Sequence, residues 1–214
     1  FNDQAKALGL YIQGVELSPR LDQQMRVAEL SYELGYFART VEISRVILPQ
    51  LDESSSVGIR LAKMAFESAL ELQEERDIER VGDYLLKSRI MTLEAFDAWM
   101  TYLTPSWLSG RLSLCIAWMN DLEADEALRA ILVARGSISA TAPDLWKNLV
   151  ESQAARLADQ PEYQVLRLPW LERSERLQIQ TPLLFQRPDL FESSEIDDLL
   201  FESAAWSMEV GLTK

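Results

Sequence analysis

The sequence predicts an all-α protein of stacked antiparallel helical hairpins, with a Pro-rich irregular arm and a C-terminal helix. Apolar residues recur at helical spacing through the first two-thirds of the chain. Strand patterns are nearly absent, and the one alternating stretch covers residues 177–181. Of the 214 residues, 48% are hydrophobic and 26% are charged, which supplies enough apolar side chains for a core. We therefore expect a single all-α domain over residues 1–214.

The N-terminal part of the chain predicts a pair of helices. Ser18 can cap the first helix with Pro19 at its first position, and Gly35 is placed to end it. The second helix begins near Phe37 and should stop at Pro49, because proline cannot continue the helical hydrogen bonds. The apolar faces are Leu21, Met25, Ala28 and Tyr32 on the first helix and Phe37, Val41, Ser44 and Leu48 on the second.

A second pair of helices follows a polar loop at residues 52–56. Its two apolar stripes are Val57, Leu61, Met64, Ser68 and Leu72, and then Ile78, Val81 and Leu85. Further helices are predicted at about residues 92–103, 105–120, 122–135, 143–159 and 195–210. Helix starts are marked by Thr92, by Thr104 and by a capping box from Thr141 to Asp144, and Gly136 marks an end.

Residues 160–193 differ from the rest, because four prolines interrupt any long helix there. We expect an irregular arm or short helical pieces. The arm is apolar, so it either packs on its own domain or docks on a partner. Trp170 is the first choice as an interface anchor, since aromatic side chains carry a large share of binding energy. The candidate partner-binding residues are Trp170, Leu183, Leu184 and Phe185.

The sequence is similar to itself when it is aligned with a shifted copy in which residue 32 stands opposite residue 70. We call this offset the repeat shift. This repeat shift aligns Tyr32-Glu33-Leu34 with Leu70-Glu71-Leu72 and Ile47-Leu48 with Leu85-Leu86. Each copy is a helix, a turn and a second helix. The stretch from Ala28 to Phe37, in which Gly35 and an aromatic residue mark the turn, resembles a tetratricopeptide hairpin.

The tetratricopeptide resemblance covers residues 21–90. It departs from the family where Thr40 or Val41 replaces a small residue, and where Gln73-Glu74-Glu75-Arg76 replaces the glycine turn. The resemblance implies stacked helix pairs with a concave face that binds an extended peptide or a helix. A non-repeating α-bundle is the alternative.

The composition removes most catalytic chemistry. The chain has no His and one Cys, so it lacks the usual general base, the imidazole and thiolate metal sites, and haem ligation by His. No Gly-rich phosphate-binding loop occurs. We expect no catalytic residue, no cofactor and no metal site. Cys115, which stands in an apolar run, should be a small buried residue.

The acidic residues outnumber the basic ones by 34 to 21, which gives a net charge of −13. This charge repels the phosphate backbone, so we expect no nucleic-acid partner. No apolar run is long enough to span a membrane, so we expect no membrane insertion. A lone cysteine fits a reducing compartment, which favours a cytoplasmic location. Because the first residue is Phe, we expect the sequence to be a processed product or part of a longer polypeptide.

Two groups of carboxylates are dense enough to consider for chemistry. The first, at a predicted helix start, is Asp121, Glu123, Asp125 and Glu126. Acidic side chains at a helix start interact favourably with the helix dipole, so a structural role is expected. The second is Glu195, Asp197, Asp198 and Glu202, of which Asp198 and Glu202 share a helix face and could hold Mg²⁺.

The charged residues in and before the C-terminal helix are all acidic. From Asp189 to Glu209 there are seven acidic residues and no basic one, interleaved with aromatic and aliphatic residues. Such a helix either packs on its own core with a solvated acidic face or docks into a basic-rimmed apolar groove.

The sequence favours a non-catalytic helical protein–protein interaction module, a scaffold or adaptor, with a protein as its partner. Two alternatives from other classes stay open. An acidic inhibitor of the immunity type would cover a basic partner and associate fast in a salt-sensitive way. A Mg²⁺-dependent carboxylate enzyme would need acidic pairs that converge from two helices.

Overall fold

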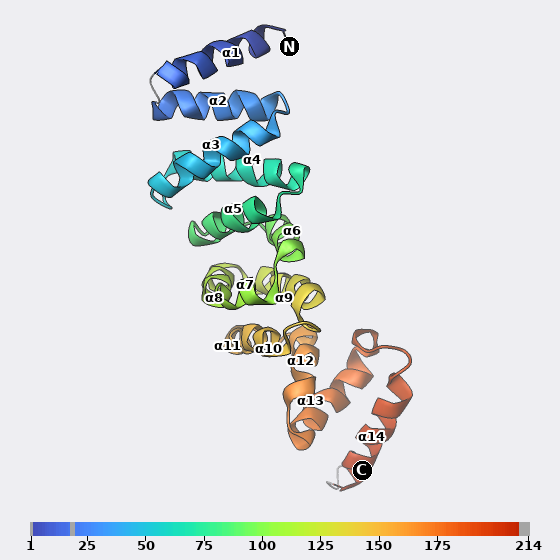
Figure 1. Ribbon diagram of the computed structural model, residues 1–214. Coiled ribbons are helices and arrows are strands. Elements are labelled where there is room, and N and C mark those ends of the chain that lie inside the picture. The colour runs from blue at the N-terminus through green and yellow to red at the C-terminus, as the bar shows by residue number, and fades with distance from the viewer. Residues whose placement is uncertain (1, 18–19, 210–214) are drawn as a thin grey trace. The chain divides into compact units, whose positions relative to one another are not determined.

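The computed structural model confirms the all-α class (Figure 1). It describes residues 2–17 and 20–209, and every regular element in those ranges is a helix. The α-helices are α1 (Asn2–Leu17), α2 (Leu21–Glu33), α3 (Phe37–Ile47), α4 (Ser56–Leu72), α5 (Glu75–Lys87), α6 (Leu93–Tyr102), α7 (Pro105–Ser109), α8 (Leu112–Asp121), α9 (Ala124–Ile138), α10 (Pro143–Glu151), α11 (Ala154–Leu157), α12 (Pro161–Arg167), α13 (Arg173–Gln186) and α14 (Ile196–Glu209). Three short 3-10 helices are η1 (Leu48–Gln50), η2 (Leu168–Trp170) and η3 (Pro188–Leu190).

The chain divides into two compact units. Residues 1–141 contain α1 to α9, and residues 142–214 contain α10 to α14. We call them unit 1 and unit 2. The expectation of a single domain over residues 1–214 stays a prediction, because two compact units can belong to one folding domain.

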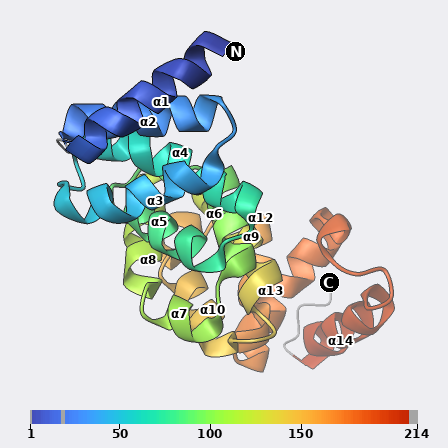
Figure 2. The same ribbon diagram turned by 45° about the horizontal axis from the view of Figure 1, so that its top comes forward.

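Helices α1 to α5 follow one another in chain order through unit 1 (Figures 1 and 2), and each packs on its neighbours in the sequence. The two predicted helix pairs correspond to α2 with α3 and to α4 with α5. The predicted stripe of α5 is buried throughout. Leu21 and Leu72, which were expected on buried faces, are exposed because each lies at the end of its helix.

Helix α1 is not predicted by the sequence pattern. It contains Gly9 and Gly14, which lower helix propensity, and among its described side chains Leu8 is the buried one. Packing against α2 therefore stabilises α1 more than its own sequence does. The predicted start signals Ser18 and Pro19 lie outside the described residues.

The α2–α3 and α4–α5 turns share one hydrogen-bond pattern at positions related by the repeat shift. The N–H groups of Gly35 and Tyr36 donate to the carbonyls of Tyr32 and Ser31 (3.0 and 2.7 Å), and those of Gln73 and Glu74 donate to Leu70 and Ala69 (3.1 and 3.0 Å). Gly35 has φ 77° and Gln73 has φ 55°, so both take the left-handed conformation of a Schellman motif. Gln73 thus makes the turn without a glycine.

Helix starts in the second half of unit 1 are partly as predicted. The hydroxyls of Thr92 and Thr104 accept hydrogen bonds from Ala95 and Trp107 and cap α6 and α7. The predicted capping box at residues 141–144 is wrong, because the Thr141 hydroxyl donates to the carbonyl of Ser137 instead.

Two boundaries also differ from the predictions. The helix expected over residues 105–120 breaks at Gly110 into α7 and α8. Gly136 does not end α9, which continues to Ile138, because the buried side chains of Ala134 and Ile138 keep the last turn packed.

The core of unit 1 is aromatic around Trp99 and Trp118. The ring of Phe96 lies 6.0 Å from Trp99 and 4.7 Å from Trp118, measured between centroids. Gly82 is required at this place, since an added Cβ would lie 2.1 Å from Trp99 Cδ1. Cys115 is buried, as predicted, and this burial raises the pKa of its thiol to about 12.

Unit 2 is built from shorter helices. The alternating stretch at residues 177–181 is not a strand, since these residues lie in α13, which also accommodates Pro182. Burial of Leu177, Leu183 and Leu184 on one side of α13 compensates for the hydrogen bond that the proline cannot make. The region predicted as an irregular arm is therefore a series of helical pieces. The helix expected over residues 143–159 divides into α10 and α11.

Polar contacts connect the pieces of unit 2. The Tyr163 hydroxyl donates to the carbonyl of Val150 at 2.7 Å, and Arg187 pairs with Glu162 at 3.1 Å. Arg176 pairs with Glu202 at 2.6 Å, so α13 holds α14 through an ion pair as well as through packing.

Candidate functional site

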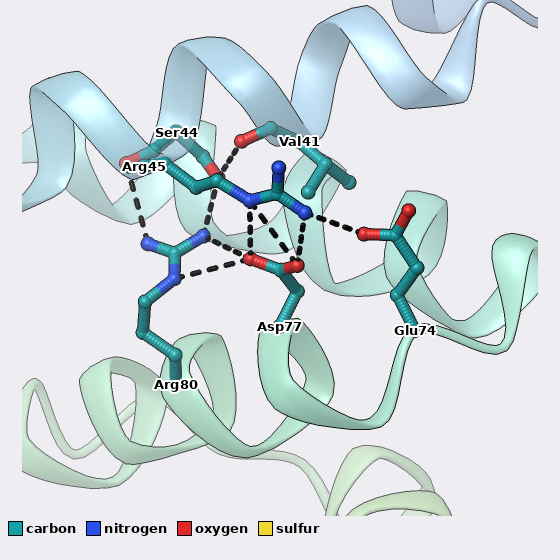
Figure 3. A network of polar contacts seen from close by, with 6 residues as sticks. All are labelled: Val41, Ser44, Arg45, Glu74, Asp77 and Arg80. Carbon is teal, nitrogen blue, oxygen red and sulfur yellow. Dashed lines mark hydrogen bonds and ion pairs between the residues drawn. The ribbon is translucent and has the colours of Figure 1, made fainter.

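A charge network joins α3 to α5 in unit 1, and Figure 3 shows it from close by. Arg45 of α3 donates to both oxygens of Asp77, from Nε at 3.1 and 3.2 Å and from Nη2 to Oδ2 at 2.5 Å. Arg80 donates to Oδ1 of the same carboxylate at 2.9 Å and to the Ser44 hydroxyl at 2.8 Å. Glu74 accepts from Arg45 at 2.6 Å. Side chains thereby bridge α3 and α5 at this junction.

The carboxylate of Asp77 is the centre of this network. Its side chain is 7% exposed, whereas those of Arg45 and Arg80 are 49% and 32% exposed. Burial alone would raise the pKa of Asp77, but the hydrogen bonds from both arginines outweigh it and lower the pKa to about 2. The network is structural, because each of its charges already has an opposite charge beside it.

The junction between α1 and α3 is different, because it contains an open groove of about 810 Å³. Apolar residues from four segments form most of its wall: Leu8, Gly9 and Ile12 of α1, Tyr36 of the turn, Phe37 of α3 and Leu72 of α4. Tyr36 is 54% exposed, and Leu72 is also exposed. Large apolar side chains at the rim of a cavity are typical of a protein-binding surface.

Two polar side chains of this α1–α3 groove have atoms without a hydrogen-bond partner. The hydroxyl of Ser31 is buried and unpaired, as is Nε of Arg39. Arg39 does pair through Nη1 with Glu42 at 3.0 Å, on the exposed side of α3.

The residues predicted to bind a partner lie elsewhere, in unit 2. Leu183 and Leu184 are buried inside it, and Phe185 is 72% exposed. Trp170 is half-buried, with its ring centroid 6.4 Å from that of Trp146. The four do not share one accessible patch, because Leu183 and Leu184 are buried. Their role in partner binding stays a prediction.

The α1–α3 groove was missed by the sequence patterns. Tyr36 stands out in the sequence only as part of a turn, and Arg39 carries no signal alone. A comparison of residue 39 with residue 77 under the repeat shift would have pointed to it, since a cation stands where the second copy has a buried carboxylate.

Several of the acidic residues singled out from the sequence are engaged in structural contacts. Asp121 pairs with Arg89 at 2.8 Å, and the N–H of Glu123 donates to the side chain of Glu126 at 3.4 Å, at the start of α9. Glu202 is held by Arg176. In the part of the chain that the structure describes, no cluster of three or more Asp, Glu, His or Cys side chains is arranged to hold a metal ion.

Within residues 2–17 and 20–209, none of the helices combines the length and apolar character needed to cross a bilayer. Comparison of the chain with family models, with curated proteins and with solved structures gave no match. Function is therefore inferred from the geometry of the α1–α3 groove.

Proposed function

We propose that this chain is a non-catalytic helical interaction module, a scaffold or adaptor, whose α1–α3 groove holds a segment of a partner protein. The observation that carries this proposal is the groove itself, an apolar cavity of about 810 Å³ with an exposed Tyr36 at its rim. Such a cavity has room for several side chains of a bound segment.

The repeat-like hairpins support the same proposal. The two helix pairs share turn geometry at positions related by the repeat shift, as tetratricopeptide-like units would. Stacked helix pairs leave grooves between successive units, and such grooves commonly bind peptides.

The proposal is tested by selecting binders from a random peptide library displayed on phage, with the whole chain as bait. The α1–α3 groove is then blocked by Gly9→Phe. Gly9 lines the groove, and a Cβ there meets no atom within 4 Å, so the phenylalanine can extend into the cavity without disturbing the helix.

The matched control is Gly14→Phe, in the same helix and equally free of neighbours, but outside the α1–α3 groove. We expect selected peptides to lose at least about tenfold in affinity with Gly9→Phe, which corresponds to about 1.4 kcal/mol, and to keep their affinity with Gly14→Phe. A library that yields no binder, or binders indifferent to Gly9→Phe, contradicts the proposal.

A second candidate, the acidic inhibitor, is favoured by the outward face of α14. Phe201 and Met208 are 77% and 66% exposed, and they share that face with exposed Asp197. An apolar stripe among carboxylates suits a basic partner. Its association would slow steeply with added salt, and measuring the association rate against salt separates it from groove binding.

The carboxylate enzyme has less support. Its one credible acidic pair includes Glu202, which is occupied by Arg176 at 2.6 Å and lies 3.9 Å from Arg173.

A further inference from the structure

The α1–α3 groove and the α3–α5 network both lie in unit 1, and they occupy corresponding places in two successive repeats. The repeat shift relates Glu74, Asp77 and Arg80 of the network to Tyr36, Arg39 and Glu42. All three of these residues line the groove. The groove is therefore the counterpart, one repeat earlier, of the α3–α5 junction, which ion pairs bridge.

The charges at the two junctions are inverted. Residue 77 is a buried carboxylate of α5 that accepts hydrogen bonds from Arg45 of α3, whereas residue 39 is an arginine. The same shift relates Arg45 to Ala7, which cannot pair with Arg39. The described residues of α1 that line the groove are Ala5, Leu8, Gly9 and Ile12, and none of these four carries a carboxylate.

Arg39 consequently has an unused donor. Its Nη1 is paired with Glu42, but its Nε is buried and has no acceptor, and the buried Ser31 hydroxyl in the same groove is also unpaired. In the network, the corresponding charge on Asp77 is satisfied by two guanidinium groups. The carboxylate beside Arg39, that of Glu42, belongs to the same helix, so among the described side chains the α1–α3 junction has no ion pair between the two helices.

We infer that the α1–α3 groove receives a partner segment in which one Asp or Glu stands between large apolar side chains, with its carboxylate pairing with the exposed part of the Arg39 guanidinium. This inference rests on the proposed function and specifies the chemistry of the partner. The carboxylate does at this junction what Asp77 does at the next one. The apolar side chains of the segment cover Leu8, Ile12 and Tyr36, and burial of that surface supplies most of the affinity.

The affinity for such a segment should depend on salt in a specific way. A net charge of −13 repels an acidic segment at long range, while the contact with Arg39 is partly buried and less screened. We therefore expect affinity to stay constant or to rise between about 50 mM and 300 mM salt, because added salt screens the repulsion first. A basic partner bound to the acidic face of α14 would show the opposite trend.

The test compares peptides selected from the random phage library on the native chain with peptides selected on the Arg39→Glu variant. We expect Asp or Glu flanked by apolar residues to be enriched by the native chain, and Lys or Arg to be enriched by the variant. Thermal unfolding of the variant serves as the folding check, and Arg39→Gln, which removes the charge without reversing it, is the second variant.

A double-mutant cycle then isolates the contact. A peptide selected on the native chain is compared with its Asp→Asn or Glu→Gln form. On the native chain we expect the amide form to bind about tenfold more weakly, and on Arg39→Gln we expect the two forms to bind within about twofold of each other.

The possible failures are distinguishable. Peptides that are blocked by Gly9→Phe but show no acidic enrichment, or whose amide form binds equally well to the native chain, overturn this inference and leave the proposed function standing. Peptides that are indifferent to Gly9→Phe overturn both.

Discussion

The α3–α5 and α1–α3 junctions of unit 1 show how two similar frameworks lead to different surfaces. At the first, Arg45 and Arg80 converge on Asp77 and bridge α3 and α5. At the second, Arg39 takes the corresponding place and the gap remains an apolar groove. A few side chains, rather than the path of the backbone, decide whether a junction is sealed or open to a ligand.

The largest effect is expected from Asp77→Ala. Removing the carboxylate leaves two arginines facing each other at a partly buried site, so we expect a loss of about 3 kcal/mol in the free energy of unfolding. Urea denaturation of both proteins measures it. The Arg45→Ala and Asp77→Ala double variant serves as control and should lose less than the sum of the two single losses. Additive losses would show that the network does not hold the junction.

The stabilisation that the Asp77 carboxylate provides depends on pH. The folded pKa of Asp77 is about 2, below the usual value of 3.8, so its stabilisation is present above about pH 4 and is lost as the pH falls toward 2. The difference in Tm between the native chain and Asp77→Asn should therefore narrow from pH 5 to pH 2, as seen by circular dichroism. A difference that stays constant over that range would contradict the assignment.

The two turns allow a reciprocal exchange of intermediate size. Gly35→Gln places a Cβ in the left-handed conformation and should cost about 1 kcal/mol, whereas Gln73→Gly relieves that strain and should gain about 0.5 kcal/mol. Chemical denaturation measures both changes. If the exchange shifted stability in the same direction at both turns, the two hairpins would not share one turn geometry.

The smallest effect is expected from Glu42→Gln. The Arg39–Glu42 pair is exposed, with side-chain exposures of 39% and 54%, so its loss should change the free energy of unfolding by less than about 0.5 kcal/mol. A loss as large as that of Asp77→Ala would mean that the Arg39–Glu42 pair within α3 stabilises the fold as much as the α3–α5 network does, which would remove the contrast between the two.

The helical class and the four helices of residues 21–87 were predictable, because their apolar residues recur regularly and because Gly35 and Pro49 mark the ends of the first two. Helix α1 was not, since its packing on α2 compensates for two glycines. The left-handed conformation of Gln73 was also beyond sequence reasoning, because tertiary packing imposes it on a residue that rarely adopts it.

The candidate site was less predictable than the fold. Trp170 and Phe185 were chosen because aromatic residues anchor interfaces, whereas the α1–α3 groove is formed by residues from four separate segments. No local pattern of residue types can show that Leu8, Tyr36 and Leu72 line the same groove. The charge inversion between residues 39 and 77 is visible in the sequence, but its meaning needs the geometry of both junctions.

The reactivity of Cys115 can be used to measure how often the interior of unit 1 opens. Because its thiol is buried and its pKa is raised to about 12, the thiolate that reacts with a disulfide reagent is scarce until the core opens. The rate of labelling at this one sulfur therefore records how often the aromatic core around it is exposed to solvent, without any engineered probe.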